Sequence, residues 1–367
     1  MIRKSTIYFL LFLLVGCTNS SDQLQQTQQN NQPNQEVVAI NLAPPEISAY
    51  LLQVPWSINK VGSAFYLSER PGMIAKVENG VTTRQKVSLK KRLSTAAEAG
   101  FLGFVLAPDF LHSKVAYAYY TYENRTGQFN RIVELTQTSD EEWEETRILL
   151  DKIPSGAVHH GGRLKIGPDG KLYATTGDAR ARPEIAQNIS SLGGKILRLN
   201  LDGSIPKDNP FPNSYVFSYG HRNPQGLAWD SDGNLFASEH GPSAHDEINK
   251  IEPGKNYGWP TITGTESNPG MESPFFQSGK DTWAPSGMAF YKNKLYVATL
   301  RGNAIREFNL ETMTTSIVVA GFGRIRDVLV EGDTLYFVTN NTDGRGTPAQ
   351  DDDKLYRIEL SEEPSES

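Results

Sequence analysis

Leu172-Tyr173-Ala174 is a short aromatic-bearing β-pattern, and it is followed by Lys195-Ile196-Leu197-Arg198-Leu199, which alternates apolar with charged or polar residues. This pair of patterns occurs six times, always in the same order. The aromatic copies are Ala64-Phe65-Tyr66-Leu67, Ala116-Tyr117-Ala118-Tyr119, Leu172-Tyr173-Ala174, Leu235-Phe236-Ala237, Leu295-Tyr296-Val297 and Leu335-Tyr336-Phe337. The alternating copies are Ile74-Ala75-Lys76-Val77, Arg131-Ile132-Val133-Glu134-Leu135, Lys195-Ile196-Leu197-Arg198-Leu199, Glu247-Ile248-Asn249-Lys250-Ile251, Ala304-Ile305-Arg306-Glu307-Phe308 and Lys354-Leu355-Tyr356-Arg357-Ile358.

The spacing of these copies indicates a radial repeat fold. Consecutive aromatic copies begin between 40 and 63 residues apart, which leaves room for four short strands and their turns. A propeller blade has this content. The sequence therefore predicts an all-β, six-bladed β-propeller with four antiparallel strands per blade.

The composition agrees with an all-β chain that is rich in turns. The 367 residues include 32 glycines and 21 prolines, and aromatic residues make up 10% of the chain. The formal net charge of −6 argues against nucleic-acid binding, because no basic stripe offers phosphate neutralisation.

The N-terminus has the pattern of an export signal. Arg3 and Lys4 precede the apolar run 7–15, which is too short to span a membrane but fits a secretory signal. Leu14-Val15-Gly16-Cys17 resembles the lipobox of bacterial lipoproteins, and Cys17 is the sole cysteine, so no intrachain disulfide can form. The alternative is an ordinary signal peptide with an incidental cysteine.

These features predict four segments. Residues 1–16 are expected to be a signal peptide, and residues 17–44 a lipidated Cys17 with a flexible Gln/Asn-rich tether. Residues 45–361 are expected to form the propeller, and 362–367 a disordered tail. The protein is then expected to be exported and lipid-anchored at the cell envelope.

Several loops next to the aromatic strands carry polar residues that a propeller would bring together at its central channel. His159 and His160 precede two glycines, so a flat ligand could approach the backbone there. The following strand ends at Asp178, whose carboxylate could orient an imidazole. A structural histidine with a satisfied hydrogen bond is the alternative for each imidazole.

The loop 220–226 holds Arg222 and Asn223, which can donate several fixed hydrogen bonds to carbonyl or carboxylate oxygens. A structural loop held by Arg222 is the alternative. The segment from Glu239 to Pro260 is rich in oxygen ligands, which suits a hard cation such as Ca²⁺.

Three arginines, Arg301, Arg324 and Arg326, lie at the ends of the last two predicted blades. Arg324 and Arg326 lie two residues apart and share one face of an extended segment. Cations gathered in a channel repel one another unless an anion lies between them, and a polycarboxylate would pair with them. Salt bridges to Asp327, Asp333 or Asp343 are the alternative.

Together these loops resemble the soluble quinoprotein sugar dehydrogenases, which are glucose/sorbosone dehydrogenase-like proteins. The matching stretches are Gly100-Phe101-Leu102-Gly103-Phe104 with Pro108-Asp109-Phe110, residues 159–170 with Gly177-Asp178, residues 194–203, 220–226 and 241–260, and Arg324-Ile325-Arg326-Asp327. They occur in family order over residues 60–358. The resemblance implies a six-bladed propeller that holds pyrroloquinoline quinone (PQQ), a planar tricarboxylate quinone, together with Ca²⁺.

The resemblance also implies roles for individual residues. It makes His159 the general base, Asp178 its supporting carboxylate, and Arg222 and Asn223 contacts of the quinone oxygens. Gly241 and Pro242 correspond to carbonyl ligands of the cofactor-bound calcium, and Glu247 and the main chain of Tyr257 to a second, structural calcium site. Glu98, Arg301, Arg324 and Arg326 correspond to cofactor-binding positions.

Some positions depart from glucose dehydrogenase. Glu98 replaces a glutamine, Arg301 replaces a lysine, and His160 replaces a different polar residue. The long insertions around the glucose pocket are absent, and the segment 264–283 is short. In these features the chain resembles the aldose sugar dehydrogenase branch of the family. The resemblance implies a more open entrance to the substrate site.

The resemblance implies a reaction in which His159 removes the proton of the anomeric hydroxyl group of a cyclic aldose and hydride passes from the anomeric carbon to the quinone, giving a lactone. Sugars and an external electron acceptor (a quinone, cytochrome or dye) would be the partners, besides the membrane that holds the Cys17 lipid. Two alternatives are a calcium-dependent lactonase-type hydrolase and a non-catalytic propeller binding module. The three arginines argue against the hydrolase, because a lactone carries no carboxylates to pair with them.

Overall fold

The computed structural model describes residues 43–180 and 182–360, all of which belong to one compact unit. The predicted signal peptide, the lipidated Cys17, nearly all of the tether and the tail 362–367 lie outside these residues. None of the helices within the described ranges is both long and apolar enough to cross a membrane.

Four of the sheets have four strands each, and their neighbours pair antiparallel. In spatial order, one contains β1 (Glu46–Ala49), β24 (Leu355–Glu359), β23 (Thr334–Thr339) and β22 (Ile325–Glu331). The next three follow chain order: β10 (Leu164–Ile166), β11 (Leu172–Thr176), β12 (Lys195–Leu199) and β13 (Val216–Tyr219); β14 (Pro224–Trp229), β15 (Leu235–Glu239), β16 (Glu247–Ile251) and β17 (Phe276–Gln277); and β18 (Pro285–Tyr291), β19 (Lys294–Thr299), β20 (Ala304–Asn309) and β21 (Thr314–Ala320).

The fifth sheet has eight strands and joins two antiparallel meanders. One meander contains β2 (Pro55–Val61), β3 (Ala64–Glu69), β4 (Met73–Glu78) and β5 (Val81–Ser88), and the other β6 (Phe101–Leu106), β7 (Val115–Asn124), β8 (Gly127–Ser139) and β9 (Glu142–Pro154). They join because the first residues of the long strand β9 pair parallel with the end of β5, from Lys86↔Glu142 to Ser88↔Glu144. The short helices are α1 (Phe110–Ser113) and the 3₁₀-helix Pro183–Gln187.

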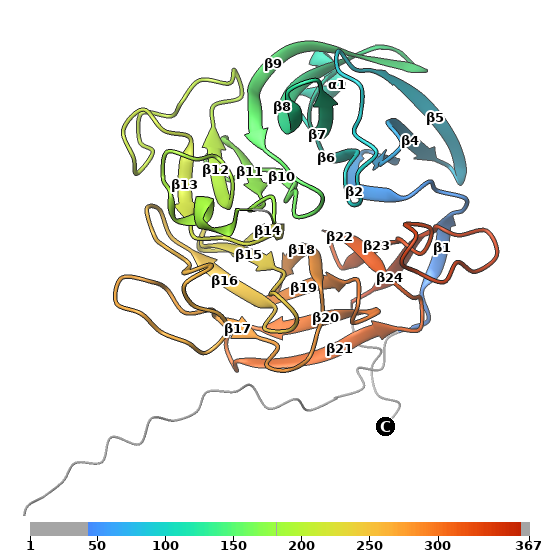
Figure 1. Cartoon of the computed structure of the whole chain (residues 1–367). Helices are drawn as coiled ribbons and strands as arrows, with labels where there is room; N and C mark the ends of the chain where they lie inside the picture. The colour runs from blue at the N-terminus through green and yellow to red at the C-terminus, as the bar shows by residue number, and fades with distance from the viewer. Residues whose placement is uncertain (1–42, 181, 361–367) are drawn as a thin grey trace, which may run out of the picture. The chain divides into compact units, whose positions relative to one another are not determined.

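The all-β, propeller-like architecture is confirmed, with the sheets arranged around a common centre (Figure 1). The described chain has five sheets rather than six separate ones, so the number of blades stays a prediction. The end strands of the eight-stranded sheet lie against each other, since Asn59 Nδ2 on β2 donates to Phe104 O on β6 at 2.8 Å.

The two strand patterns of the sequence form neighbouring strands in every case. The aromatic copies lie on β3, β7, β11, β15, β19 and β23, and the alternating copies on β4, β8, β12, β16, β20 and β24. Each aromatic strand pairs antiparallel with the alternating strand that follows it. Their apolar side chains fill the space between adjacent sheets, as between Tyr296 on β19 and Val328 on β22.

Chain closure comes from β1, which pairs with β24 and so completes the last sheet with the first strand of the unit. Strands β2, β6, β10, β14, β18 and β22 lie nearest the centre (Figure 1). The Arg163 and Asp327 side chains form a buried ion pair of 2.9 Å among them, and Asp327 Oδ2 also accepts from Ile58 N. Hence the loops that enter the inner strands are held in a fixed relation to one another.

Candidate active site

His159 and Asp178 form a buried hydrogen-bonded pair. His159 Nδ1 lies 2.7 Å from Asp178 Oδ1, and the imidazole is 11% exposed. Since a carboxylate only accepts, Nδ1 carries the proton and Nε2 keeps its lone pair for a ligand. The sequence prediction that Asp178 orients His159 agrees with this geometry.

Close backbone packing holds His159 in place. Its φ is +64°, and its N–H donates to Glu98 Oε2 at 3.1 Å. A Cβ at Gly177 would lie 1.9 Å from His159 O, so only glycine allows the two segments to approach this closely. Trp259 Nε1 donates to Asp178 Oδ2 at 2.8 Å and fixes the second carboxylate oxygen.

His160 has a structural setting. Its Nε2 lies 3.2 Å from Ala97 O and its Nδ1 lies 3.0 Å from Ser155 Oγ. Burial lowers the His160 pKa to about 4, so the ring is neutral at pH 7. Of the two adjacent histidines, only His159 has a nitrogen left for a reacting hydroxyl group.

The Glu239 carboxylate holds the loop that carries Arg222 and Asn223. Glu239 accepts the backbone N–H groups of both residues through Oε1 and lies 2.8 Å from His221 Nδ1 through Oε2. The Arg222 guanidinium donates to His240 O at 3.0 Å and lies over the Trp259 ring at 5.4 Å. Burial lowers the pKa of Arg222, and its Nε is buried without a hydrogen-bond partner among the described residues.

The Asn223 side chain is only partly available to a ligand. Its Oδ1 accepts from Gly161 N at 3.0 Å, which ties this loop to the histidine loop. Its amide nitrogen is left to donate. Asp178 N donates to Arg222 O at 2.9 Å, so Asp178 and Arg222 are linked through the backbone as well.

Arg324 and Arg326 meet at Asp343. Arg324 Nη2 lies 2.8 Å from Asp343 Oδ2, whereas Arg326 Nη2 lies 3.9 Å from it. Arg326 donates to Gln225 Oε1 and Asn340 Oδ1, both at 2.9 Å. Burial, with the nearby Arg324 charge, lowers the Arg326 pKa to about 9. Of the salt-bridge alternatives, the pairing with Asp343 is formed, while Asp327 pairs with Arg163 and Asp333 with Lys292.

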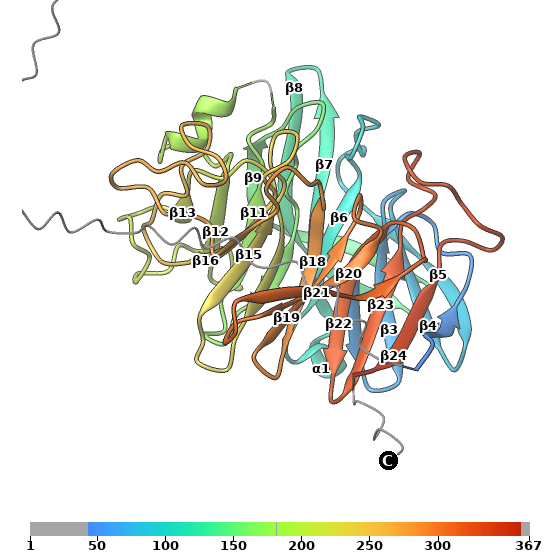
Figure 2. The same cartoon turned by 90° about the horizontal axis from the view of Figure 1, so that it is seen from below.

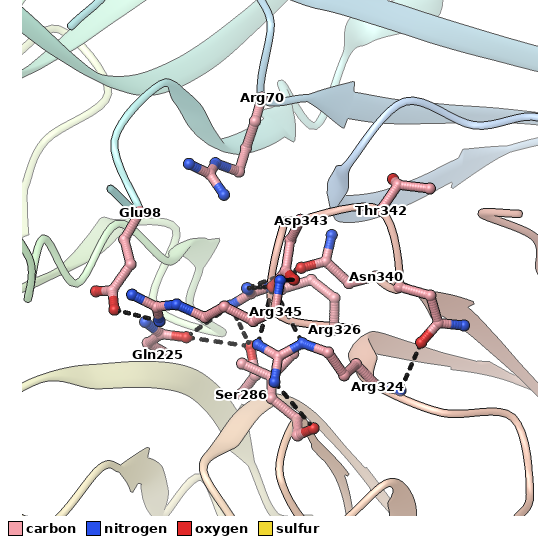
Figure 3. Close-up of polar contacts among 12 residues, drawn as sticks. Arg70, Glu98, Gln225, Ser286, Arg324, Arg326, Asn340, Thr342, Asp343 and Arg345 are labelled. Atoms are coloured by element: carbon pink, nitrogen blue, oxygen red, sulfur yellow. Dashed lines mark hydrogen bonds and ion pairs between the residues drawn. The ribbon is translucent and has the colours of Figure 1, made fainter. Parts of the chain in front are cut away.

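Two further arginines, Arg70 and Arg345, belong to the same cluster. Figure 3 shows Arg70, Arg324, Arg326 and Arg345 gathered near Asp343 and Glu98. The Arg345 guanidinium lies 2.6 Å from Glu98 Oε1. The cluster therefore sets four guanidinium groups against two carboxylates, and this excess of positive charge suits a ligand with several carboxylates.

Glu98 stays ionised in this setting. Burial raises its pKa, but the hydrogen bond from His159 N and the charge of Arg345 outweigh burial and hold the Glu98 pKa at about 2. The predicted site residue Arg301 is placed differently. It is exposed and lines an open basin beside Arg324 and Arg345 instead of the enclosed cavity between Glu98 and Arg326.

The predicted calcium ligands lie near Glu239. Within the described part of the chain no hydrogen bond occupies the Gly241 or Pro242 carbonyl, so both can ligate a cation. Glu247 lies opposite Glu239 across β15 and β16. Burial and the Glu239 charge raise the Glu247 pKa to about 8. A divalent ion would relieve this repulsion.

Tyr257 is brought to the same neighbourhood, since its ring stacks on His221 at 4.8 Å and His221 contacts Glu239. Among the described residues there is no group of three or more His, Cys, Asp or Glu side chains arranged to hold a metal. Calcium binding through the main chain of Gly241, Pro242 and Tyr257 and the Glu247 carboxylate stays a prediction.

Four contributors were not assigned roles from the sequence: Arg70, Glu239, Trp259 and Arg345. Glu239 and Trp259 lie within the oxygen-rich segment from Glu239 to Pro260, and a glutamate at the end of a predicted strand could have indicated a site residue. Arg70 and Arg345 occupy turns, and only the path of the chain brings them to Glu98 and Asp343.

Comparison with known proteins places this geometry in a family. The family model described as "Glucose / Sorbosone dehydrogenase" matches residues 52–357. The aldose sugar dehydrogenase YliI of Escherichia coli is 32% identical over 354 residues, covering 83% of this chain and 93% of that protein. Quinoprotein glucose dehydrogenase B of Acinetobacter calcoaceticus is 39% identical over 200 residues, covering 47% of this chain and 42% of that protein.

A solved structure shares both the fold and part of the sequence. The PQQ-bound aldose sugar dehydrogenase of Streptomyces coelicolor superposes with a TM-score of 0.81 at 36% identity, covering 88% of this chain and 98% of that one.

Proposed function

The chain belongs to the glucose/sorbosone dehydrogenase family, and from this premise we propose that it is a PQQ- and Ca²⁺-dependent aldose sugar dehydrogenase. Its substrates would be cyclic aldoses, oxidised at the anomeric carbon to lactones. The observation that carries the proposal is the His159–Asp178 pair beside a cluster with more guanidinium groups than carboxylates.

The arginine cluster fits the cofactor. Arg70, Arg324, Arg326 and Arg345 would pair with the carboxylates of PQQ, and Arg222 and Asn223 would donate to its quinone oxygens. The Gly241 and Pro242 carbonyls would hold the Ca²⁺ beside it. When bound, PQQ supplies a two-electron acceptor for the hydride that leaves the sugar.

His159 would provide general-base catalysis. The Nδ1–H···Asp178 hydrogen bond fixes the ring so that Nε2 can accept the proton of the anomeric hydroxyl group. As Nε2 takes up the proton, the Asp178 carboxylate stabilises the imidazolium. Trp259 and the Arg180 N–H hold Asp178 against rotation by donating at 2.8 Å and 2.7 Å.

The number of blades, the export of the protein, its lipid anchor and its electron acceptor are part of the same proposal. We place the sheets in a six-bladed propeller, counting the two meanders of the eight-stranded sheet as one blade each. We also propose export, lipid attachment at Cys17 and transfer of electrons to an external acceptor. Radioactive palmitate should label the expressed protein and should not label Cys17→Ala.

The test is reconstitution. The protein is loaded with Ca²⁺ and PQQ, aldoses are added, and dye reduction is followed. We expect reduction that depends on both PQQ and sugar, with lactone as the product. Failure to bind PQQ would overturn the cofactor assignment, whereas PQQ binding with no turnover on any aldose would overturn the reaction.

A His159→Gln variant tests the base. Turnover should fall by roughly 10²–10⁴-fold while PQQ affinity is kept. His112→Gln, on the exposed face of α1, is the matched control and should leave turnover unchanged. Full activity in His159→Gln would remove the role of His159.

A further inference from the structure

A second cavity lies at the opposite ends of the inner strands from His159. Its volume is about 460 Å³, and its walls come from the ends of β2, β6 and β22 and from α1. The active-site loops, by contrast, lead into the beginnings of these strands. Arg324, for example, lies directly before the first residue of β22. Figure 2 shows α1 and the end of β22 at the lower edge of the unit. The volume falls in the range of small-molecule sites, roughly 300–1,000 Å³.

Most of the wall is apolar, and one amine projects from it. The apolar surface comes from Val61, Val105, Leu106, Phe110 and Leu329. Lys165 comes from β10, the strand of its sheet that lies nearest the centre of the molecule. The side-chain amine of Lys165 forms no hydrogen bond or ion pair with any residue in 43–180 or 182–360. Burial lowers the pKa of Lys165, the Asp327 charge raises it and the Arg163 charge lowers it.

Among the other charged groups near this cavity, Asp327 and Lys60 belong to ion pairs, whereas Asp109 accepts from a hydroxyl group. Asp327 is held by Arg163 at 2.9 Å and by Ile58 N at 2.8 Å. Lys60 Nζ lies 2.5 Å from Glu331, and Asp109 accepts from Ser113 Oγ at 2.9 Å. His112 on α1 is exposed. Lys165 is therefore a cation beside apolar walls that makes no ion pair within the described residues; the Asp327 charge that acts on it is shared with Arg163.

We propose that this cavity binds a small organic carboxylate with an apolar body, paired through its carboxylate with Lys165 Nζ. The charge of Lys165 is costly among apolar walls unless an anion compensates it. The apolar body would pack against Phe110, Leu106 and Leu329, and the carboxylate would reach Lys165 at the inner end. This site is separate from the sugar-oxidising site and does not depend on it.

Octanoate and its neutral analogue octanamide are the probes, measured by isothermal titration calorimetry on the full chain. We expect saturable octanoate binding that is weakened about tenfold or more in Lys165→Met, because a charge-assisted hydrogen bond is lost. Lys60→Met is the matched control, because the Lys60 amine also lines the cavity but is already paired with the exposed Glu331; octanoate affinity should change by about threefold or less. Octanamide should bind the natural protein more weakly than octanoate does. The two probes should bind Lys165→Met with equal affinity.

A Leu329→Trp variant fills the cavity and should abolish octanoate binding. Thermal denaturation of each variant checks that it is folded, and dehydrogenase activity should be unchanged in Lys165→Met. Equal octanoate affinity in the natural protein and a folded Lys165→Met would overturn the proposal. Equal affinity of the natural protein for octanoate and octanamide would do the same, because the cavity would then select only apolar bulk.

Discussion

Glu98 Oε1 lies 2.6 Å from the Arg345 guanidinium, although 247 positions separate the two residues in the sequence. Glu98 precedes β6 and Arg345 follows β23, so the pair joins an early loop to a late one beside the enclosed cavity. The other oxygen of Glu98 accepts from His159 N at 3.1 Å. One carboxylate thus connects the cavity wall to the backbone of the proposed base.

Arg345→Gln should speed cofactor loading at little cost in stability. The side chains of Arg345 and Glu98 are 50% and 23% exposed, so losing the pair should change the free energy of unfolding by less than about 1 kcal/mol. PQQ should bind faster, because Arg345 no longer has to leave Glu98, and it should also dissociate faster, because one of the four guanidinium groups that would pair with its carboxylates is lost; stopped-flow tryptophan fluorescence measures both rates. Arg357→Gln, which breaks the exposed pair with Glu46, is the control and should leave both rates unchanged. An unaltered binding rate in Arg345→Gln would show that the Glu98–Arg345 ion pair does not slow PQQ entry.

Asp178→Asn should leave cofactor affinity intact and reduce turnover by roughly 10²–10⁴-fold. An amide at this position can offer an N–H to His159 Nδ1 and so favour the tautomer that has no free lone pair on Nε2. The double variant with His159→Gln should be no slower than His159→Gln alone, since both changes disable one unit. Steady-state kinetics of the three variants test this. Independent, multiplying losses would show that Asp178 acts elsewhere.

The strands could be predicted from the sequence because the apolar residues of each pattern are the ones that the fold buries. Aromatic stretches such as Leu295-Tyr296-Val297 fill the space between sheets, and the alternating stretches pair beside them. The joining of two meanders into one sheet could not be predicted in this way. It depends on β9 residues 142–144, which pair with β8 on one side and with Lys86–Ser88 of β5 on the other, and hydrophobic periodicity does not encode this second pairing.

Within the site, the sequence could predict groups whose members lie close together along the chain or flank neighbouring strands. His159 and Asp178 come from loops flanking two paired strands, β10 and β11, and Arg324 and Arg326 lie two residues apart where the chain enters β22. Arg70 and Arg345 were missed because nothing in their own turns indicates where they lie. The anion expected between Arg324 and Arg326 is partly supplied by the protein itself, since Asp343 pairs closely with Arg324.

Breaking the buried Arg163–Asp327 pair should be strongly destabilising. Both side chains are 1% exposed, and a Cβ at Gly287 would meet Asp327 Oδ1 at 1.7 Å, so this carboxylate cannot move toward β18 to find water. Arg163→Met leaves a buried, unpaired charge and should cost about 3–5 kcal/mol in the free energy of unfolding. Urea denaturation measures this, with Lys292→Met, whose partner Asp333 is exposed, as the control.

The double variant Arg163→Met/Asp327→Asn decides between loss of charge pairing and loss of packing. If the uncompensated Asp327 charge is the cause, removing it should restore part of the stability lost in Arg163→Met, so the two losses are not additive. Strict additivity of the single losses would show that the ion pair contributes nothing beyond the packing of its side chains.

His160→Gln should make the protein less sensitive to acid. Burial lowers the His160 pKa from 6.5 to about 4, so between these values the unfolded chain binds a proton that the folded chain does not. This contribution to stability is fully present above pH 6.5 and is lost as the pH falls toward 4, by up to about 1.4 kcal/mol per pH unit. His240, whose pKa burial lowers to about 3, adds to the same trend.

Glutamine at position 160 can still donate to Ala97 O but does not titrate. Urea denaturation between pH 4 and 6.5 should therefore show a slope smaller by about one proton in His160→Gln than in the natural protein. His112→Gln, on the exposed α1, should keep the original slope. Equal slopes for His160→Gln and the natural protein would mean that His160 takes up its proton in the folded state as readily as in the unfolded chain, and that the ring is not held neutral by burial.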